Sequence, residues 1–88
     1  MSQEEDLVLP VLFHLYRRNL WGASYTPKEK ALSKIPKRLR GDGMEVIERL
    51  IKRGLLIDHK GGKCVSLNTG EKEEILRVLK DHYPDYYF

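Results

Sequence analysis

The chain has 88 residues, 16 Lys and Arg against 13 Asp and Glu, a net charge of +3 and 41% hydrophobic residues. A chain of this length forms one domain with a modest core, which excludes large enzyme folds such as α/β barrels and dinucleotide-binding sheets. We therefore predict a single domain over residues 1–88, with its core in residues 8–82 and an aromatic tail in residues 83–88.

Positive charge is concentrated in the middle of the chain. Residues 17–63 carry 13 basic and five acidic side chains, whereas residues 1–16 carry three acids and no Lys or Arg. Residues 64–88 carry three basic and five acidic side chains. A basic segment between two acidic ends indicates an acidic partner, such as nucleic acid.

The composition also bears on compartment and cofactors. Cys64 is the single cysteine, so it forms neither an internal disulfide nor a metal knuckle, and we expect a reducing cytoplasm and no metal or cofactor. The longest apolar run, residues 7–13, has seven residues. A membrane span needs about 18 or more, so we expect a cytoplasmic protein that does not enter membranes. High Lys, Arg and Glu with one Gln and two Asn resembles thermophile composition.

The first predicted helix runs from Pro10 to about Leu20, because proline is tolerated in the first turn of a helix and disrupts later turns. Residues 7–9 are then extended or form a kinked first turn. Apolar residues cover most of its circumference and leave a narrow polar arc of His14, Arg17 and Arg18. Such a helix must be covered on several sides, by other helices plus either the aromatic tail or a second copy of the chain. We therefore expect a homodimer through the first and C-terminal helices.

A short second helix is predicted from Thr26 as N-cap, Pro27 at the first helical position and Glu29 completing a capping box. It ends at about residue 34 or 35, because Pro36 disfavours helical geometry in the residue before it. The basic segment at residues 37–40 then forms a connector.

Asp42 followed by Glu45 predicts the start of a third helix, from about Gly43 to Arg53, with Gly54 ending it. The expected inward stripe is Met44, Ile47, Leu50 and Ile51. The outward arc carries Glu45, Glu48, Arg49 and Lys52.

Two strand-like runs, residues 55–60 and 63–68, surround Gly61 and Gly62 and predict a β-hairpin with a basic tip. Asn68 followed by Glu71 predicts the cap of a last helix that ends at about His82, before Pro84. The predicted class is therefore α+β, mainly α with a small hairpin.

This order of elements resembles the winged helix-turn-helix domain of small prokaryotic, archaeal-type transcription regulators. The likeness covers residues 8–82 and rests most on residues 47–57, which are similar to the end of a recognition helix followed by a first wing strand. Residues 61–63 match a wing tip, and residues 65–70 match the return strand. The resemblance implies a three-helix core, a wing and a C-terminal helix.

The resemblance also implies binding to double-stranded DNA, with the third helix in the major groove and the hairpin on an adjacent phosphate or minor groove. By this analogy Arg49 and Lys52 contact the groove or its phosphates. Lys37, Arg38 and Arg40 contact the backbone, and Lys60 and Lys63 act from the wing.

Several alternatives stay open at this point. The fold also serves as a protein-interaction module that binds no DNA. Residues 34–40 could be a solvated loop, and Arg49 and Lys52 could pair along the helix with Glu45 and Glu48. His59 and Cys64 face each other in the predicted hairpin, where packing is a better explanation than a metal site. No Ser/His/Asp set, paired catalytic carboxylates or phosphate-binding loop is evident, so we do not expect an enzyme.

Overall fold

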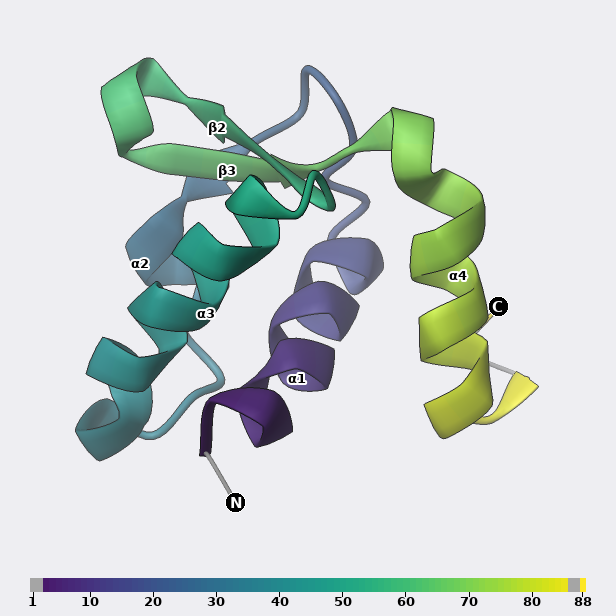
Figure 1. The fold of residues 1–88 in the computed structure, drawn as a ribbon, viewed down its shortest axis with the longest axis horizontal. Coiled ribbons are helices and arrows are strands. Elements are labelled where there is room, and N and C mark those ends of the chain that lie inside the picture. Colours follow the sequence, from purple (N-terminus) through teal and green to yellow (C-terminus); the bar gives the residue numbers. More distant parts are fainter. Residues whose placement is uncertain (1–2, 86–87) are drawn as a thin grey trace.

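The computed structural model describes residues 3–85 and residue 88; Tyr86 and Tyr87 of the predicted aromatic tail lie outside the described residues. The helices and strands are, in chain order, α1 (Gln3–Arg17), β1 (Thr26–Pro27), α2 (Lys28–Ala31), α3 (Arg40–Lys52), β2 (Leu56–His59), β3 (Cys64–Leu67) and α4 (Lys72–His82) (Figure 1). This confirms the predicted α+β class. No helix in the described part of the chain is both long enough and apolar enough to cross a bilayer.

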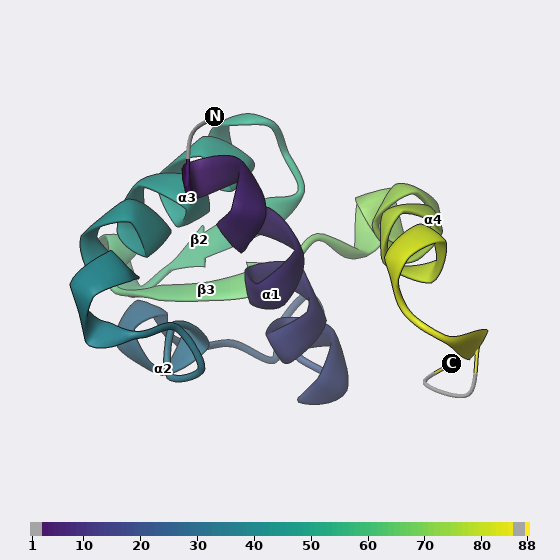
Figure 2. The ribbon, with the colours of Figure 1, turned by 90° about the horizontal axis from the view of Figure 1, so that it is seen from below.

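The three strands form one antiparallel sheet in the order β1-β3-β2, and the helices lie to one side of the hairpin. Figures 1 and 2 show α1 between α3 and α4. The core consists of apolar side chains from all three of these helices and from the sheet, among them Leu12, Ile47, Leu67 and Ile75, each at most 1% exposed.

The start of α1 differs from the prediction, because Pro10 lies inside the helix and not at its first position. Proline in a helix interior deprives the carbonyl four residues earlier of its hydrogen bond. That carbonyl belongs to Asp6, an exposed residue, so the missing hydrogen bond is less unfavourable there than in the core. Leu7, one residue later, is 6% exposed and packs in the core, which favours helical geometry before the proline.

Helix α1 also ends earlier than the predicted Leu20. Asn19 has a φ of 55°, and the amides of Leu20 and Asn19 donate to the carbonyls of Leu15 and Tyr16 at 3.1 and 2.9 Å. These two bonds form a Schellman motif, with asparagine in the left-handed position that glycine more often occupies. Because asparagine and not glycine occupies this left-handed position, the sequence pattern did not indicate that the helix ends here.

Thr26 is not a helix cap. Thr26 and Pro27 form the edge strand β1 and pair with Val65 and Cys64 of β3, and the Lys28 amide donates to the Lys63 carbonyl at 3.0 Å. Helix α2 therefore begins at Lys28 and lasts one turn. Residues 32–35 continue as tight turns and not as the longer helix that the capping pattern predicted.

Helix α3 begins at Arg40, so Asp42 is no N-cap and the glycines on either side of it are helical. Gly43 is buried, and a Cβ atom there would lie 2.8 Å from Cδ2 of Leu32, at the turn that follows α2. The glycine thus permits close approach of the two segments and does not mark a break.

The C-terminus of α3 is confirmed at Gly54. Its φ is 83°, and the amides of Leu55 and Gly54 donate to the carbonyls of Leu50 and Ile51, both at 3.0 Å. The inward stripe is rotated from the predicted one. Gly43, Val46, Ile47 and Leu50 are buried, whereas Met44, predicted to face inward, is 36% exposed.

The predicted hairpin is present, with His59 paired to Cys64, but its connection has four residues, 60–63, and not two. Lys60, Gly61 and Gly62 all have positive φ, between 55° and 94°. Three successive residues in this conformation require a longer loop than a two-residue turn.

The predicted cap and end of the last helix are confirmed in part. The Asn68 side chain accepts from the Gly70 amide at 2.9 Å and caps a short 3₁₀ turn that leads into α4, which ends at His82. Beyond it, the Tyr83 ring stacks on Phe13 of α1 with centroids 3.9 Å apart, and Phe88 lies 5.1 Å from Tyr16. The described residues of the aromatic tail therefore cover part of the apolar surface of α1.

Candidate nucleic-acid interface

The basic connector predicted at residues 37–40 forms a 3₁₀ turn, Lys37–Leu39, and the first residue of α3. Lys37 and Arg38 are exposed, and the structure gives neither side chain a partner among the described residues. Arg40 is half-buried, and its Nε donates to the Ile35 carbonyl at 3.2 Å. The guanidinium of Arg40 is thus held against the end of the α2 turn, with its outer nitrogens directed away from that bond.

The outer face of α3 presents Arg49 and Lys52 as predicted. Both are exposed and line a shallow groove together with Met44, Glu45 and Glu48. The groove therefore has an acidic part toward the N-terminal half of α3 and a basic part toward its C-terminal end.

The hairpin tip presents Lys60 and Lys63, both exposed. The Lys60 ammonium lies 5.7 Å from the centroid of the Tyr25 ring, in cation–π range, and Tyr25 in turn stacks on His59. The two lysines line a second groove, which also includes Lys28 and Met44. The tip of the hairpin is therefore adjacent to the N-terminal half of α3.

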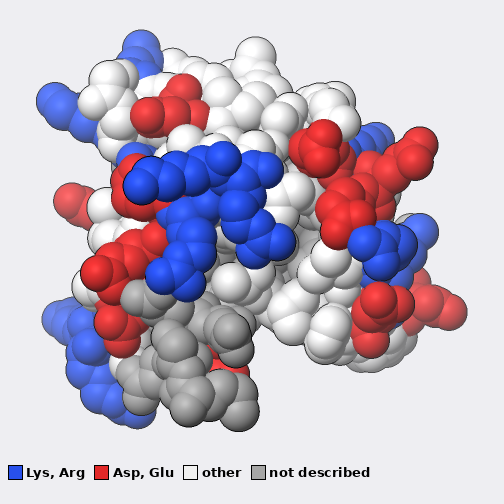
Figure 3. All heavy atoms as spheres, viewed as in Figure 1, with Lys and Arg blue, Asp and Glu red and all other residues white. Residues whose placement is uncertain are grey.

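Met44 lines both grooves, so the outer face of α3 and the hairpin tip share one surface. Lys37, Arg38 and Arg40 line neither of the two grooves. On the face drawn in Figure 3, Lys and Arg atoms form separate groups over the C-terminal half of α3, near its N-terminal end and at the hairpin, with Asp and Glu atoms between them. Arg49 and Lys52 therefore form one basic group and Lys60 and Lys63 another, on grooves that share Met44, and the connector lines neither groove.

An ion pair between α2 and α3 was not predicted. Lys28 is only 4% exposed, and its Nζ lies 2.6 Å from Oε2 of Glu48, whose side chain is 53% exposed. One of the alternatives left open by the sequence paired Glu48 with Lys52 along the helix. The two residues are 20 positions apart, and no spacing rule connects them, so only the tertiary fold reveals the pair.

His59, which pairs with Cys64 across β2 and β3, belongs to a packed hydrogen-bond chain that does not include the cysteine. Ser66, fully buried, donates from Oγ to the Gly22 carbonyl at 2.8 Å, and its Oγ lies 2.9 Å from His59 Nε2. Because the hydroxyl proton is used by Gly22, Ser66 accepts from His59, which assigns the proton to Nε2. A serine arranged this way is no nucleophile. Among the described residues, no three His, Cys, Asp or Glu side chains gather in a way that would hold a metal ion.

No protein-family model, no curated protein and no solved structure matches this chain. Function therefore has to be argued from the chain's own geometry.

Proposed function

We propose that this chain is a cytoplasmic winged-helix protein that binds double-stranded DNA as a small transcription regulator. The order of elements and the strand order β1-β3-β2 support the proposed fold, since they put a solvent-facing helix α3 beside a β-hairpin. The observation that carries the proposal is the surface shared by α3 and the hairpin tip, on which Met44 lines both grooves. A helix beside a basic hairpin matches the width of a major groove and a neighbouring phosphate.

The proposed contacts follow from exposure and charge. Arg49 and Lys52 reach the major groove or its phosphates from α3, and Lys60 and Lys63 reach phosphates from the hairpin. Lys37, Arg38 and Arg40 bind the backbone beside the N-terminal end of α3.

The ion pair with Lys28 supports the placement of α3 against DNA. Two carboxylates on the outer face, Glu45 and Glu48, would repel phosphate. Glu48 is compensated at 2.6 Å by Lys28, so its charge is largely cancelled near the surface. Glu45 on α3 and Glu29 at the hairpin groove are the other carboxylates that line the two grooves.

The proposal is tested by fluorescence anisotropy with a labelled duplex of about 20 base pairs. Four or more phosphate contacts should weaken binding by about a hundredfold or more between about 50 and 200 mM salt. The variant Lys60→Ala/Lys63→Ala should bind at least about tenfold more weakly and show a shallower salt slope. Arg77→Ala/Lys80→Ala, which removes the same charge from exposed positions of α4, is the matched control and should bind like the wild type.

Absence of salt-sensitive binding at micromolar protein contradicts the proposal. Equal losses in the hairpin and α4 variants also contradict it, because they indicate a response to net charge and not to a located surface.

A second candidate is a protein-interaction module that binds no DNA, and the exposure of Met44 favours it. Met44 is 36% exposed at the junction of the two grooves, an apolar centre with charged residues around it, as in many protein interfaces. The variant Glu45→Gln separates the candidates. Removal of its charge should raise DNA affinity about threefold or more if α3 faces phosphate, whereas a module that binds no DNA should show no salt-sensitive duplex binding with either the wild type or this variant.

We also propose a homodimer through α1 and α4, although the tail already covers Phe13 and Tyr16. Leu9 on α1 and Leu76 on α4 are only half-buried and give a second copy an apolar surface. Light scattering at high micromolar concentration should return twice the monomer mass, and a monomer under those conditions excludes this assembly.

A further inference from the structure

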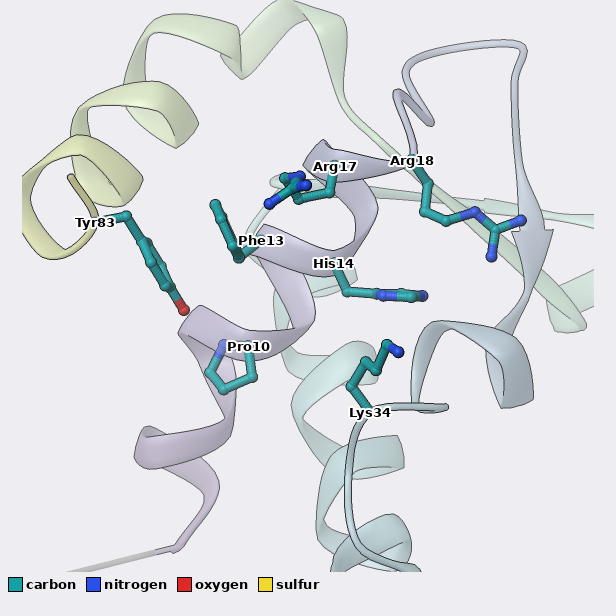
Figure 4. A pocket seen from close by; sticks show the side chains of 7 residues that line it. All are labelled: Pro10, Phe13, His14, Arg17, Arg18, Lys34 and Tyr83. Atoms are coloured by element: carbon teal, nitrogen blue, oxygen red, sulfur yellow. The ribbon is translucent and has the colours of Figure 1, made fainter. Parts of the chain in front are cut away.

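A pocket of about 470 Å³ lies on the outer face of α1, away from the surface proposed for DNA (Figure 4). Its volume falls within the range of sites for small organic molecules. The lining residues come from α1, from Lys34 in the turns after α2 and from Tyr83 at the start of the tail. Three segments distant in sequence therefore build it.

One side of the pocket is flat and apolar. Phe13 and Tyr83 stack almost parallel, with an angle of 7° between the rings, and Pro10 continues the same wall. Both aromatic rings and the proline are half-buried, so part of this wall is accessible. Such a wall favours a planar apolar group.

The other side is basic. Arg18 and Lys34 are exposed, and neither forms an ion pair with any residue in the described part of the chain. The His14 ring lies between these two side chains, as Figure 4 shows. Arg17, also at the rim, has its guanidinium 5.7 Å from the Phe13 ring centroid. No carboxylate lines the pocket, so its positive charge is not compensated within it.

His14 adds an unsatisfied polar atom to this side. Its Nε2 is buried and has no hydrogen-bond partner among the described residues. A buried polar atom without a partner is unfavourable.

We propose that this pocket binds a small organic anion with a flat apolar body, for which 1-naphthoate serves as a probe. The ring system lies against Pro10, Phe13 and Tyr83, and the carboxylate lies beside the His14 ring, within reach of Arg18 and Lys34. The proposal does not depend on DNA binding, because none of the lining residues belongs to the surface proposed for DNA.

The test is titration of the ¹⁵N-labelled chain with 1-naphthoate, followed by two-dimensional NMR. Amide shifts should localise to α1, to the turns around Lys34 and to Tyr83, with saturation below about 1 mM. 1-Naphthylmethylammonium, which has the same ring and the opposite charge, should bind at least about tenfold more weakly. Equal binding of the two probes, or no localised shifts at about 5 mM 1-naphthoate, overturns the proposal.

Substitutions locate the anion. Lys34→Met and Arg18→Met keep much of the apolar side chain and remove the charge, and each should weaken 1-naphthoate about fivefold or more. Arg53→Met removes one charge from an exposed position at the end of α3 and is the matched control. A spectrum with native dispersion establishes that each variant folds. If Arg53→Met weakens binding as much as Lys34→Met does, the anion is not held in this pocket.

The pH dependence of affinity gives a readout that a merely structural role of His14 would not produce. The charged groups around the imidazole are Arg17 and Arg18 of α1 and Lys34, and the Tyr83 hydroxyl is on the opposite wall. A bound carboxylate favours protonated His14, so affinity should rise about threefold or more from about pH 8 to about pH 5.5. The variant His14→Gln should bind but lose this rise; an unchanged rise excludes His14 from the site.

Discussion

Lys28 illustrates how one residue can link two helices through charge. The side chain is 4% exposed and its ammonium is 2.6 Å from the Glu48 carboxylate, which remains half in water. Burying a charge is unfavourable unless a partner compensates it, and removing only the partner leaves the charge stranded. Removing the Glu48 carboxylate and removing the Lys28 ammonium should therefore change the free energy of unfolding by different amounts.

We predict that Glu48→Gln destabilises the chain by about 1–3 kcal/mol, because Lys28 then has no ionic partner. Lys28→Met keeps the buried apolar stem and removes the charge, so its effect should stay within about 1 kcal/mol. Urea unfolding followed by Trp21 fluorescence measures both, with Glu73→Gln at an exposed position of α4 as control. If Lys28→Met lowers the free energy of unfolding as much as Glu48→Gln does, or more, this explanation of the ion pair is wrong.

His14 predicts a pH dependence of stability. Burial lowers the pKa of His14 below its ordinary value of about 6.5, and the positive charges of Arg18 and Lys34 lower it further, opposed in part by a hydrogen bond to the Lys30 backbone. The folded chain therefore binds fewer protons than the unfolded chain between the lowered pKa and about 6.5. Stability should rise with pH across that window and stop rising above it.

Urea midpoints at intervals between about pH 5 and 7.5 check this prediction, compared between the wild type and His14→Gln. The variant should show a smaller rise, because the other titrating groups are common to both proteins. Identical pH profiles would mean that His14 titrates with the same pKa in the folded and unfolded chain.

At the scale of elements, the ends of α3 and α4 were predicted correctly, whereas the ends of α1 and α2 and the starts of α1 and α3 were not. Gly54 ends α3 and Pro84 follows α4 because left-handed backbone and proline act locally, and the sequence displays both. The starts of α1 and α3 were misjudged, because the apparent signals at Pro10 and around Asp42 were overridden by burial of Leu7 and by the contact of Gly43 with Leu32. Tertiary packing decided those boundaries.

Gly41 and Gly43 provide a matched pair within α3. A Cβ at Gly41 would meet nothing within 4 Å, so Gly41→Ala should stabilise the chain by about 0.5–1 kcal/mol through helix propensity. A Cβ at Gly43 would meet buried Leu32 at 2.8 Å. We expect Gly43→Ala to be less stable than Gly41→Ala by about 1 kcal/mol or more. Thermal unfolding measures the difference, and equal stabilities would show that Leu32 moves aside without strain.

The sequence predicted some parts of the candidate surfaces and missed others, because it displays local signals but not contacts between distant segments. Lys60 and Lys63 flank a glycine pair, a local signal, and the structure puts them at the hairpin tip. The polar arc of His14, Arg17 and Arg18 was visible in the helical periodicity. The pocket beside it was not, because Lys34 and Tyr83 approach α1 only through the fold.

At the scale of the whole molecule, α4 stands beside α1 at the edge of the fold (Figure 2). The core contacts of α4 come from Ile75 and Leu79, both fully buried. At the C-terminal end of α4, aromatic rings of the tail contact α1: the Tyr83 ring stacks on Phe13, and the Phe88 ring lies near Tyr16. The helix is therefore anchored along its length by side chains and at its end by the tail.

We predict that Tyr83→Ala loosens the last turns of α4 without unfolding the rest. Amide hydrogen exchange in residues 76–82 should accelerate by about threefold or more, while exchange in α3 stays the same. Tyr25→Ala, an exposed aromatic near the hairpin, is the control and should leave α4 unchanged. Uniform acceleration through all helices in Tyr83→Ala would mean that the tail supports global stability and not α4 alone.

The packing of α3 has a practical consequence for protein engineering. Gly43 is constrained by Leu32, and position 48 is constrained by Lys28, so changing either one requires a compensating change elsewhere. Gly41 and Lys52 point to solvent on the same helix. A library that randomises the solvent-facing positions while holding 43 and the 28–48 pair fixed would vary the outer surface of α3 and keep the fold. One that also randomises position 48 would lose much of its diversity to unfolded chains.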